Sequence, residues 1–154
     1  MAHFAELESK TDPTSFTSDT HLVVKRVVVV DNAHVPSDEH ADGETWCVNF
    51  FDGGTWKQTS YNNNFRKQYA GIGMVYNASK NKFLSTQPYA SWALDSSDDW
   101  QAPVTYPSSI TYGDGSVSYM VSWDEDNLRW VGTDADGSTF AWDPDNSSWS
   151  STGG

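Results

Sequence analysis

Apolar and polar positions alternate at the start of the chain and then give way to a run of β-branched residues. Residues 3–7, HFAEL, alternate, and residues 22–30, LVVKRVVVV, are rich in valine, which fits a pleated strand. These segments are predicted to be the first two strands. The segment between them, SKTDPTSFTSDT, is polar and rich in turn-forming residues, so it is predicted to be a long exposed loop rather than a tight turn.

One helix is predicted within residues 37–54, SDEHADGETWCVNFFDGG. Ser37 is the expected N-cap, acidic residues follow it, and two glycines provide a stop. Gly43 lowers the helix propensity of the segment. The apolar side chains at helical spacing are Trp46, Cys47, Phe50 and Phe51.

The strongest regularity is a repeated pair of aromatic residues seven positions apart. It occurs in YNASKNKF (76–83), WDEDNLRW (123–130) and WDPDNSSW (142–149), with a looser copy in ALDSSDDW (93–100). In a hairpin with an even loop, positions i and i+7 face each other on one side of the sheet. The repeats therefore predict hairpins with cross-strand aromatic pairs, in which the Asn or Asp after the first aromatic accepts a backbone hydrogen bond. The predicted pairs are Tyr76 with Phe83, Trp123 with Trp130, and Trp142 with Trp149.

These elements predict a mainly β (α+β) fold: a small antiparallel sheet with one short helix, followed by aromatic-rich β-hairpins. We expect a β-rich N-terminal domain with the short helix over residues 1–105 and an acidic tandem hairpin appendage over residues 106–154. Because an isolated hairpin is marginally stable, the hairpins must pack on each other, on the N-terminal sheet or on another chain.

Charge is distributed unevenly. Residues 1–88 carry 8 basic and 10 acidic side chains, whereas Arg129 stands alone against 11 acids in the remainder. Such a surface repels phosphate, so nucleic acid is not an expected partner. Residues 22–30 are too short and too charged to span a membrane, and no secretory signal is recognised, so a soluble protein is expected. Cys47, the single cysteine, lies among apolar residues and is predicted to be a buried structural thiol.

No catalytic set is recognised, and neither a catalytic residue nor a cofactor is expected. The four histidines form no metal-binding or nucleophile-activating motif and are interpreted as solvated or capping residues. The glycines of AGIG (70–73) and GDGS (113–116) lack the spacing of phosphate-binding loops and are interpreted as turn glycines.

Two acidic patterns resemble functional sites. Asp134, Asp136 and Gly137 resemble the front of a calcium loop, but no Glu follows to complete the ligands, so an ordinary turn is preferred and no metal is expected. The pairs Asp124 with Asp126 and Asp143 with Asp145 could serve a glycosidase. They fall at predicted hairpin tips, however, where no pocket would raise a pKa.

The aromatic content supports two interpretations. Exposed tryptophans such as Trp130 and Trp149 could stack against sugars in an adhesion or glycan-binding module. Alternatively, a small β protein with few aliphatic residues builds its core from aromatic rings.

A resemblance to a known family rests on five segments: MAHFAEL, VVKRVVVVDN, GTWKQTSYNNNFRKQYAGIGMVYN, QPYASWALD and WDEDNLRW. Together they resemble the small virion structural proteins of marine tailed bacteriophages, especially those that infect cyanobacteria. The similarity covers about residues 1–8, 22–32, 44–107 and 117–131, and the WKQTSYNNNFRKQYAGIG block is its most specific part. The chain departs from the pattern in its long SKTDPTSFTSDTH segment and in the added WDPDNSSW hairpin.

The resemblance implies a non-enzymatic structural protein located on the virion and made in the host bacterial cytoplasm. It implies a position on the capsid exterior, as a decoration or cement protein, or on a tail appendage. The expected partner is the major capsid protein or another virion protein, and a homo-oligomer is possible.

Residues 56–77 concentrate aromatic and basic side chains and are the predicted attachment surface. Arg, Tyr and Trp are enriched at protein interfaces. An equally supported alternative is a buried β-hairpin in which Asn62, Asn63 and Asn64 form a turn that tolerates positive φ. The predicted interface residues are Trp56, Lys57, Tyr61, Phe65, Arg66, Lys67 and Tyr69.

Overall fold

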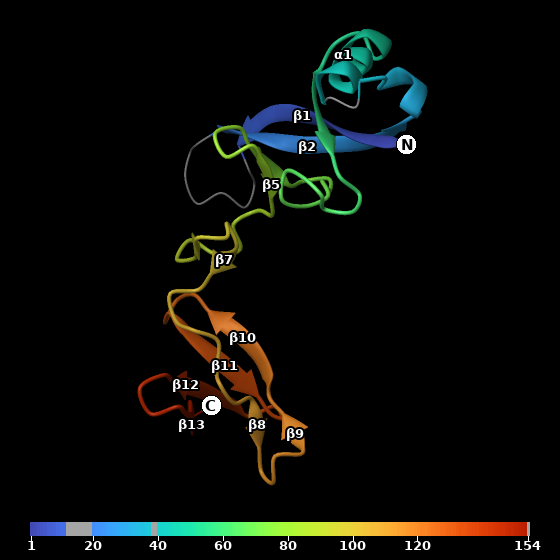
Figure 1. The fold of residues 1–154 in the computed structure, drawn as a ribbon. Coiled ribbons are helices and arrows are strands. Elements are labelled where there is room, and N and C mark those ends of the chain that lie inside the picture. Colours follow the sequence, from blue (N-terminus) through green and yellow to red (C-terminus); the bar gives the residue numbers. More distant parts are fainter. Residues whose placement is uncertain (12–19, 38–39, 154) are drawn as a thin grey trace. The chain divides into compact units, whose positions relative to one another are not determined.

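The computed structural model describes residues 1–11, 20–37 and 40–153, and the fold is mainly β with antiparallel sheets, as predicted (Figure 1). The chain divides into two compact units, Met1–Thr86 and Gln87–Gly154. This division precedes the boundary expected after residue 105. Residues 87–105 belong to the second unit because Tyr89, Trp92, Ala102 and Val104 pack against its buried tryptophans.

The N-terminal unit is built on a five-stranded antiparallel sheet with the order β3-β1-β2-β4-β5. Both predicted strands are confirmed and are longer than expected; the loop predicted between them falls mostly on residues 12–19, which lie outside the described residues. A β-bulge between Glu6 and Leu7 shifts the β1–β2 register. The strands are β1 (Ala2–Thr11), β2 (Thr20–Val30), β3 (Thr55–Thr59), β4 (Val75–Asn77) and β5 (Lys82–Leu84).

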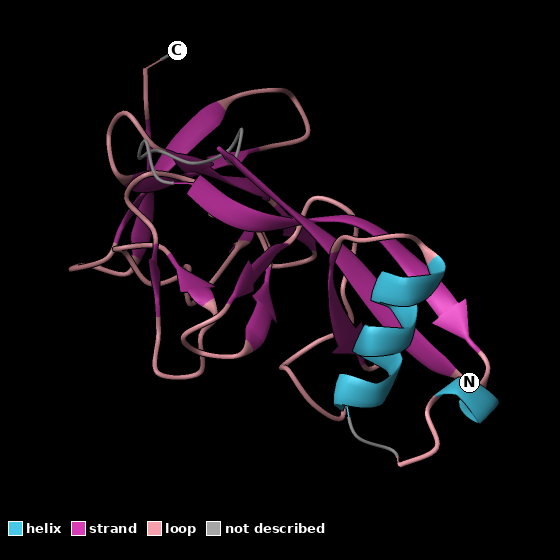
Figure 2. Cartoon of the chain, turned by 90° about the horizontal axis from the view of Figure 1, so that it is seen from above, coloured by secondary structure: helices cyan, strands magenta, loops and turns pink. Residues whose placement is uncertain are grey.

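Alternate residues of the strands point to opposite faces of this sheet, and each face has its own hydrophobic core. Helix α1 (His40–Phe50) and the short 3₁₀ helix η1 (Asn32–His34) lie on one face (Figure 2). The core on that face consists of Ala2, Phe4, Val30, Val35, Cys47 and Trp56. The opposite face is covered by Ala70 and Met74 from the segment after β3, and its core consists of Ala5, Leu7, Val24, Ala70, Tyr76 and Phe83.

The predicted helix is confirmed. The N–H and hydroxyl of Ser37, the expected N-cap, both donate to the carboxylate of Asp42, and residues 38 and 39 lie outside the described residues. The apolar side chains at helical spacing differ in burial. Cys47 is fully buried, whereas Phe50 is 65% exposed. The packing of the helix depends instead on Gly43, whose backbone lies against the ring of Phe4.

The hairpin alternative for residues 56–77 was wrong. β3 pairs with β1, whereas β4 pairs with β2, so the two strands are not neighbours. The residues between them, 60–74, form a long connection rather than a turn. Asn63 does adopt a positive φ of 60°, as the asparagine run predicted, and Arg66 and Lys67 also have positive φ.

The C-terminal unit contains a four-stranded meander and two short hairpins. The meander has the order β10-β11-β12-β13. Its strands are β10 (Met120–Asp124), β11 (Arg129–Thr133), β12 (Thr139–Asp143) and β13 (Ser148–Ser151). The short hairpins are formed by β6 (Ala93–Leu94) with β7 (Trp100–Gln101), and by β8 (Thr111–Tyr112) with β9 (Val117–Ser118).

The predicted aromatic pairs are confirmed. The paired rings lie 5.1 Å apart in the first repeat, 5.0 Å in the second and 5.2 Å in the third. The looser copy differs, because Leu94 rather than Ala93 faces Trp100. In order, the confirmed pairs are Tyr76 with Phe83, Trp123 with Trp130, and Trp142 with Trp149.

The repeats also share the conformation of their turns. The sixth residue of each repeat has a positive φ, between 48° and 60°, which the sequence pattern had not revealed. The Asn or Asp after the first aromatic accepts backbone N–H groups within the turn, as predicted, two or three residues further on. The four left-handed residues are Asn81, Asp98, Leu128 and Ser147.

Three tryptophans, Trp123, Trp130 and Trp142, form the core of the C-terminal unit. Their neighbours hold the indole N–H groups in place: Trp123 Nε1 donates to Glu125 at 2.7 Å and Trp130 Nε1 donates to the carbonyl of Val104 at 2.8 Å. The interpretation of the aromatics as core residues therefore holds for this unit.

Candidate protein-binding surface

The structure separates the predicted interface residues into an inward group and an outward group. Trp56, Lys57 and Arg66 make contacts within the N-terminal unit, whereas Tyr61 is 67% exposed and Tyr69 lies beside it. Phe65 and Lys67 are half-buried.

Trp56 is a core residue, with 3% of its surface exposed. Its ring stacks on Phe51 at 4.8 Å, and its Nε1 donates to the carbonyl of Gly53 at 3.0 Å. The guanidinium of Arg26 lies 5.3 Å from the same ring. The residue therefore holds helix α1 and β3 together and is not available as an anchor for a partner.

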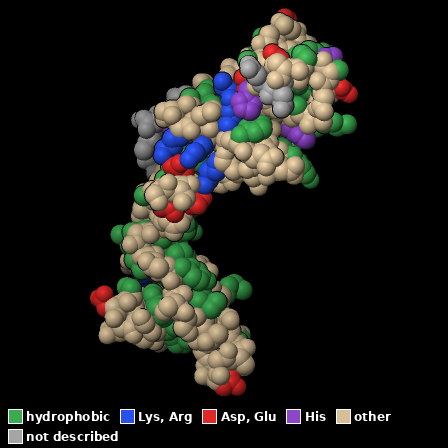
Figure 3. Space-filling view, viewed as in Figure 1, with side chains coloured by type: hydrophobic (Ala, Val, Ile, Leu, Met, Phe, Trp, Pro, Cys, Tyr) green, Lys and Arg blue, Asp and Glu red, His purple; other side chains and the backbone are tan. Residues whose placement is uncertain are grey.

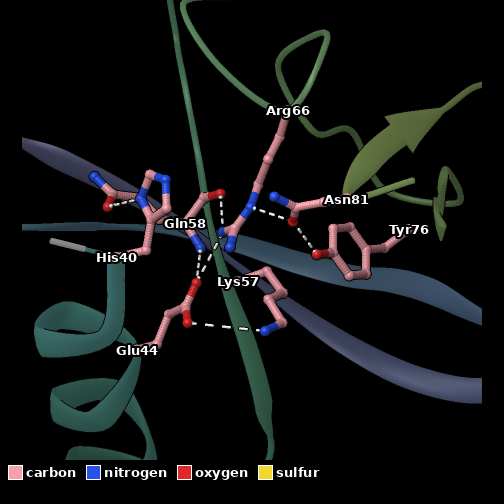
Figure 4. A network of polar contacts seen from close by, with 7 residues as sticks. All are labelled: His40, Glu44, Lys57, Gln58, Arg66, Tyr76 and Asn81. Carbon is pink, nitrogen blue, oxygen red and sulfur yellow. Dashed lines mark hydrogen bonds and ion pairs between the residues drawn. The ribbon is translucent and has the colours of Figure 1, made fainter. Parts of the chain in front are cut away.

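Arg66 is the centre of a polar network at the edge of the sheet (Figure 4). Only 7% of its side chain is exposed. Its Nη1 donates to Glu44 Oε1 at 2.8 Å and to the carbonyl of Gln58 at 2.9 Å, and its Nε donates to Asn81 Oδ1 at 2.9 Å. Arg66 thus joins the 60–74 connection, helix α1, β3 and the β4–β5 turn. Arg66 therefore has a structural role, whereas the sequence had predicted that it binds a partner.

The other members of the network surround β3. Lys57 Nζ lies 3.9 Å from Glu44 Oε2 and 5.9 Å from the centre of the Tyr76 ring. His40 Nδ1 lies 2.8 Å from Gln58 Oε1, and the His40 ring packs against Phe65 at 4.5 Å. These contacts hold the side chains around β3, with Arg66 almost fully buried and Lys57 about one-third exposed.

Both outer strands of the sheet have backbone groups that are already bonded. On β3, the N–H of Gln58 donates to Glu44 Oε1 at 2.8 Å and its carbonyl accepts from Arg66. On β5, the N–H of Phe83 donates to the carbonyl of Arg66 at 3.1 Å, and its carbonyl accepts from Gln68 Nε2. Unpaired edge strands invite pairing with another chain. At Gln58 and Phe83 the edge strands are therefore not available for pairing with another chain, which favours side-chain surfaces for binding.

One such surface is a cluster that we call the aromatic patch, defined as His3, Val29, Tyr61 and Tyr69, in which Val29 and Tyr61 are exposed and the other two residues are half-buried. The three rings all contact one another. His3 stacks on Tyr61 at 5.6 Å and meets Tyr69 edge-on at 5.5 Å, and the two tyrosines lie 5.3 Å apart. Val29 pairs with His3 across the strands and is 55% exposed. The patch combines apolar ring faces with two phenolic hydroxyls, a composition typical of protein interfaces.

The surroundings favour uncharged side chains in the aromatic patch. Partial burial, together with the nearby N-terminal charge, lowers the pKa of His3. Burial and the neighbouring Tyr61 raise the pKa of Tyr69. Both shifts keep the rings neutral near pH 7, which suits an aromatic contact surface.

A shallow cavity of about 270 Å³ adjoins the patch. It is formed where the N-terminus passes the beginning of the 60–74 connection. Its lining includes Met1, His3, Ser60, Tyr61, Asn62 and Phe65. The cavity gives a partner side chain a place to enter beside the exposed ring of Tyr61.

Sequence reasoning missed His3, which was interpreted as a solvated or capping residue. Three of the histidines instead lie against aromatic rings: His3 in the patch, His34 on Trp46 at 4.6 Å, and His40 on Phe65. The alternation of the first strand was the available signal, because it places His3 on the same face as Ala5 and Leu7.

The acidic pairs have structural roles in turns. Asp124 accepts from the backbone and side-chain N–H groups of Asn127, and Asp143 does the same for Asn146. These hydrogen bonds lower the pKa of both aspartates, which is opposite to what a general acid requires. Asp134 likewise accepts two backbone N–H groups of its own turn. In the described part of the chain, no cluster of three or more His, Cys, Asp or Glu side chains is placed to hold a metal ion.

The tryptophans proposed as sugar platforms are occupied within the fold. Trp130 is 8% exposed and donates to Val104, and Trp149 is half-buried with its Nε1 donating to the carbonyl of Ser109 at 2.8 Å. The ring of Trp130 is therefore not a free stacking surface, whereas Trp149 is half-exposed beside Tyr119 and Trp142.

The comparisons with family models, curated proteins and solved structures give no match to this chain. Among the residues described, no helix has the length and hydrophobicity required to cross a bilayer.

Proposed function

We propose that this chain is a non-enzymatic structural protein that attaches to a larger protein assembly through the aromatic patch. The observation that carries the proposal is the mutual contact of His3, Tyr61 and Tyr69 at the surface of the N-terminal unit, where Tyr61 is exposed and the other two rings are half-buried. Tyrosines in a tight surface group are characteristic of the residues that dominate binding energy at interfaces.

The patch is also held in place before any partner binds. The N–H of Tyr69 donates to Asn63 Oδ1 at 2.7 Å, the N–H of Asn64 to Ser60 Oγ at 2.8 Å, and the N–H of Ala70 to Thr59 Oγ1 at 2.8 Å. Binding by a preorganised segment costs less ordering entropy than binding by a flexible one. The asparagine run therefore supports attachment by fixing the backbone that presents the tyrosines.

We infer from the family resemblance that the assembly is the virion of a marine tailed phage. The chain would decorate the capsid exterior as a decoration or cement protein, with the major capsid protein or another virion protein as its partner. The charge distribution supports an outward position for the C-terminal unit: its single basic residue, Arg129, is paired with Asp124 at 3.0 Å, whereas Lys and Arg side chains gather on the N-terminal unit (Figure 3). A strongly acidic surface keeps densely displayed copies apart.

The test is binding of the purified chain to particles of the phage that encodes it, prepared without the chain. Tyr61→Ala and Tyr69→Ala should each weaken binding at least about tenfold, because truncation of an interface hot spot costs about 2 kcal/mol or more. Phe50→Ala is the matched control, since Phe50 is a similarly exposed ring elsewhere on the same unit. Binding of both tyrosine variants at the unmodified affinity would reject the patch, and virions that never contain the chain would reject the structural role.

A further inference from the structure

A groove of about 440 Å³ lies on the C-terminal unit, and none of its lining residues is used above for attachment. Its apolar lining includes Val104 and two prolines, Pro103 and Pro144, and its aromatic lining is formed by Tyr106 and Trp142. Tyr106 is 52% exposed, and its ring meets the buried Trp130 edge-on at 5.1 Å. An aromatic ring is thus presented at the groove on a rigid support.

One of the residues that line the groove, Trp142, carries a hydrogen-bond donor that the described part of the fold does not use. Trp123, Trp130 and Trp149 each donate their indole N–H to an acceptor in the unit. Trp142 Nε1 makes no hydrogen bond with any described residue. It is not fully enclosed, because the one completely buried side-chain nitrogen or oxygen without a partner in the described residues is Trp92 Nε1.

The two tryptophan repeats explain why this donor is free. In WDEDNLRW, Glu125 lies two residues after Trp123 and accepts its indole N–H. In WDPDNSSW, the corresponding position is Pro144, which has no side-chain acceptor. Pro144 itself lines the groove.

Four residues with hydroxyl groups line the same groove. These are Thr105, Tyr106, Ser108 and Ser147, and none of their hydroxyls hydrogen-bonds to another residue in the described part of the chain. Of the described residues, none that lines the groove is charged. A hydroxyl both donates and accepts, so the groove offers a neutral polar rim around an aromatic and proline surface.

We propose that this groove binds a neutral saccharide. The apolar C–H face of a pyranose ring would pack on Tyr106, because C–H groups are attracted to the negative face of an aromatic ring. A sugar hydroxyl would accept the indole N–H of Trp142, and others would exchange hydrogen bonds with the surrounding hydroxyls. The volume is within the range of small-ligand sites. The 11 acidic side chains of this unit against one arginine disfavour an acidic sugar.

A proline-rich peptide is the competing occupant, since prolines also pack on Tyr and Trp rings. Its backbone offers carbonyl acceptors but no N–H donors at proline. The carbonyl groups of such a peptide would accept the indole N–H of Trp142, but the peptide would donate no hydrogen bonds to the hydroxyl oxygens of the groove. The hydroxyl groups of a saccharide can do both. The hydroxyl content therefore favours the saccharide.

The experiment is a titration of the ¹⁵N-labelled full chain, followed through the indole N–H signals. The probes are the neutral disaccharides cellobiose, lactose and maltose, the anionic digalacturonate, and decaproline. We expect at least one neutral disaccharide to move the Trp142 indole signal with a dissociation constant of about 1 mM, and digalacturonate to leave it unchanged. Tyr106→Ala should weaken the binding at least about tenfold, whereas Met120→Ala, at a 77% exposed residue of the same sheet, should not.

Pro144→Glu is the decisive variant, because it restores the acceptor found in the sister repeat. It should occupy Trp142 Nε1, change its indole signal without ligand, and weaken saccharide binding at least about tenfold. Pro144→Gln should weaken binding similarly without adding charge, and Pro144→Ala should retain it. Failure of all three neutral disaccharides to move the Trp142 signal, a response to decaproline alone, or full binding by Pro144→Glu would overturn the proposal. The outcome is independent of particle binding, since Tyr61 and Tyr69 lie in the other unit.

Discussion

Arg66 Nη1 lies 2.8 Å from Glu44 Oε1, and this ion pair fastens the 60–74 connection to helix α1 around the edge of β3. The pair is shielded, since the side chains are 7% and 16% exposed. It differs in this respect from the surface pairs of the chain, such as Lys10 with Glu8, whose side chains are almost half exposed. Arg66 therefore stabilises the fold. Its effect on any surface formed by the 60–74 connection is indirect, because it only holds that connection in place.

Arg66→Ala is expected to destabilise the N-terminal unit by about 3–5 kcal/mol, because Glu44 loses its partner in a shielded position. Urea unfolding followed by circular dichroism measures the change. Lys57→Ala is the matched control: its 3.9 Å contact with the same carboxylate is more exposed, so the cost should stay below about 1 kcal/mol. Equal unfolding midpoints for Arg66→Ala and the unmodified chain would contradict the assigned role.

Gly43→Ala should destabilise the protein, although alanine ordinarily stabilises a helix by about 1 kcal/mol relative to glycine. A Cβ at this position would lie 2.0 Å from Phe4 Cζ, and Phe4 is fully buried. Overpacking of this kind costs about 1–3 kcal/mol. Thermal unfolding should show a lower midpoint for Gly43→Ala and little change for Thr45→Ala at an exposed helix position. The double variant Gly43→Ala with Phe4→Leu should be less destabilised than the sum of its parts, and strict additivity would argue against the clash.

Leu128→Asn should stabilise the C-terminal unit. Leu128 has a φ of 52° and is about half exposed, and a left-handed conformation costs a branched residue about 1–2 kcal/mol. Asparagine tolerates this conformation, so a gain of about 0.5–1 kcal/mol is expected in chemical denaturation. The reciprocal change in the sister hairpin, Ser147→Leu, should be destabilising by a similar amount. A destabilising Leu128→Asn would show that contacts of the leucine outweigh its backbone strain.

Acid should weaken the C-terminal unit through its turn aspartates. The side-chain and backbone hydrogen bonds from Asn146 lower the pKa of Asp143 below its usual 3.8, and Asn127 has the same effect on Asp124. A carboxyl whose pKa is lower in the folded than in the unfolded state contributes stability above its unfolded pKa and loses it as the pH falls through the folded value. The midpoint of thermal unfolding, followed by tryptophan fluorescence, should therefore decrease below about pH 4.

Asp143→Asn should lower the unfolding midpoint at neutral pH and reduce its dependence on acid. Asp126→Asn is the control, because Asp126 makes no hydrogen bond with the described residues and should change neither quantity much. Identical acid profiles for Asp143→Asn and the unmodified protein would remove the turn carboxylate as the cause.

Elements whose contacts are close in sequence were predictable. The pairing of Trp123 with Trp130 follows from a seven-residue spacing and a turn between them, because both determinants lie within eight consecutive residues. The helix followed in the same way from local spacing and its glycine stop. The exact pairing of Leu94 with Trp100 was missed, since a shift of one residue depends on loop geometry that the spacing alone does not specify.

The candidate site was only partly predictable. Tyr61 and Tyr69 were identified from composition, but so were Trp56 and Arg66, which the structure places inside. The aromatic content alone cannot separate these groups, because a ring and a guanidinium serve equally well in a core, a network or an interface.

The sequence by itself determined the β-rich class, the helix and the aromatic hairpins, because turn chemistry and periodic spacing act over a few residues. Only the tertiary structure decided that His3 meets Tyr61 and Tyr69, that Arg66 reaches Glu44, and that Trp142 keeps an unused donor beside Pro144. The contacts of His3 and of Arg66 depend on how β1, α1 and the 60–74 connection pack together. The surroundings of Trp142 depend on where residues 103–108 lie beside the last hairpin. Such contacts arise from the burial of surfaces far apart in the chain, which no local pattern encodes.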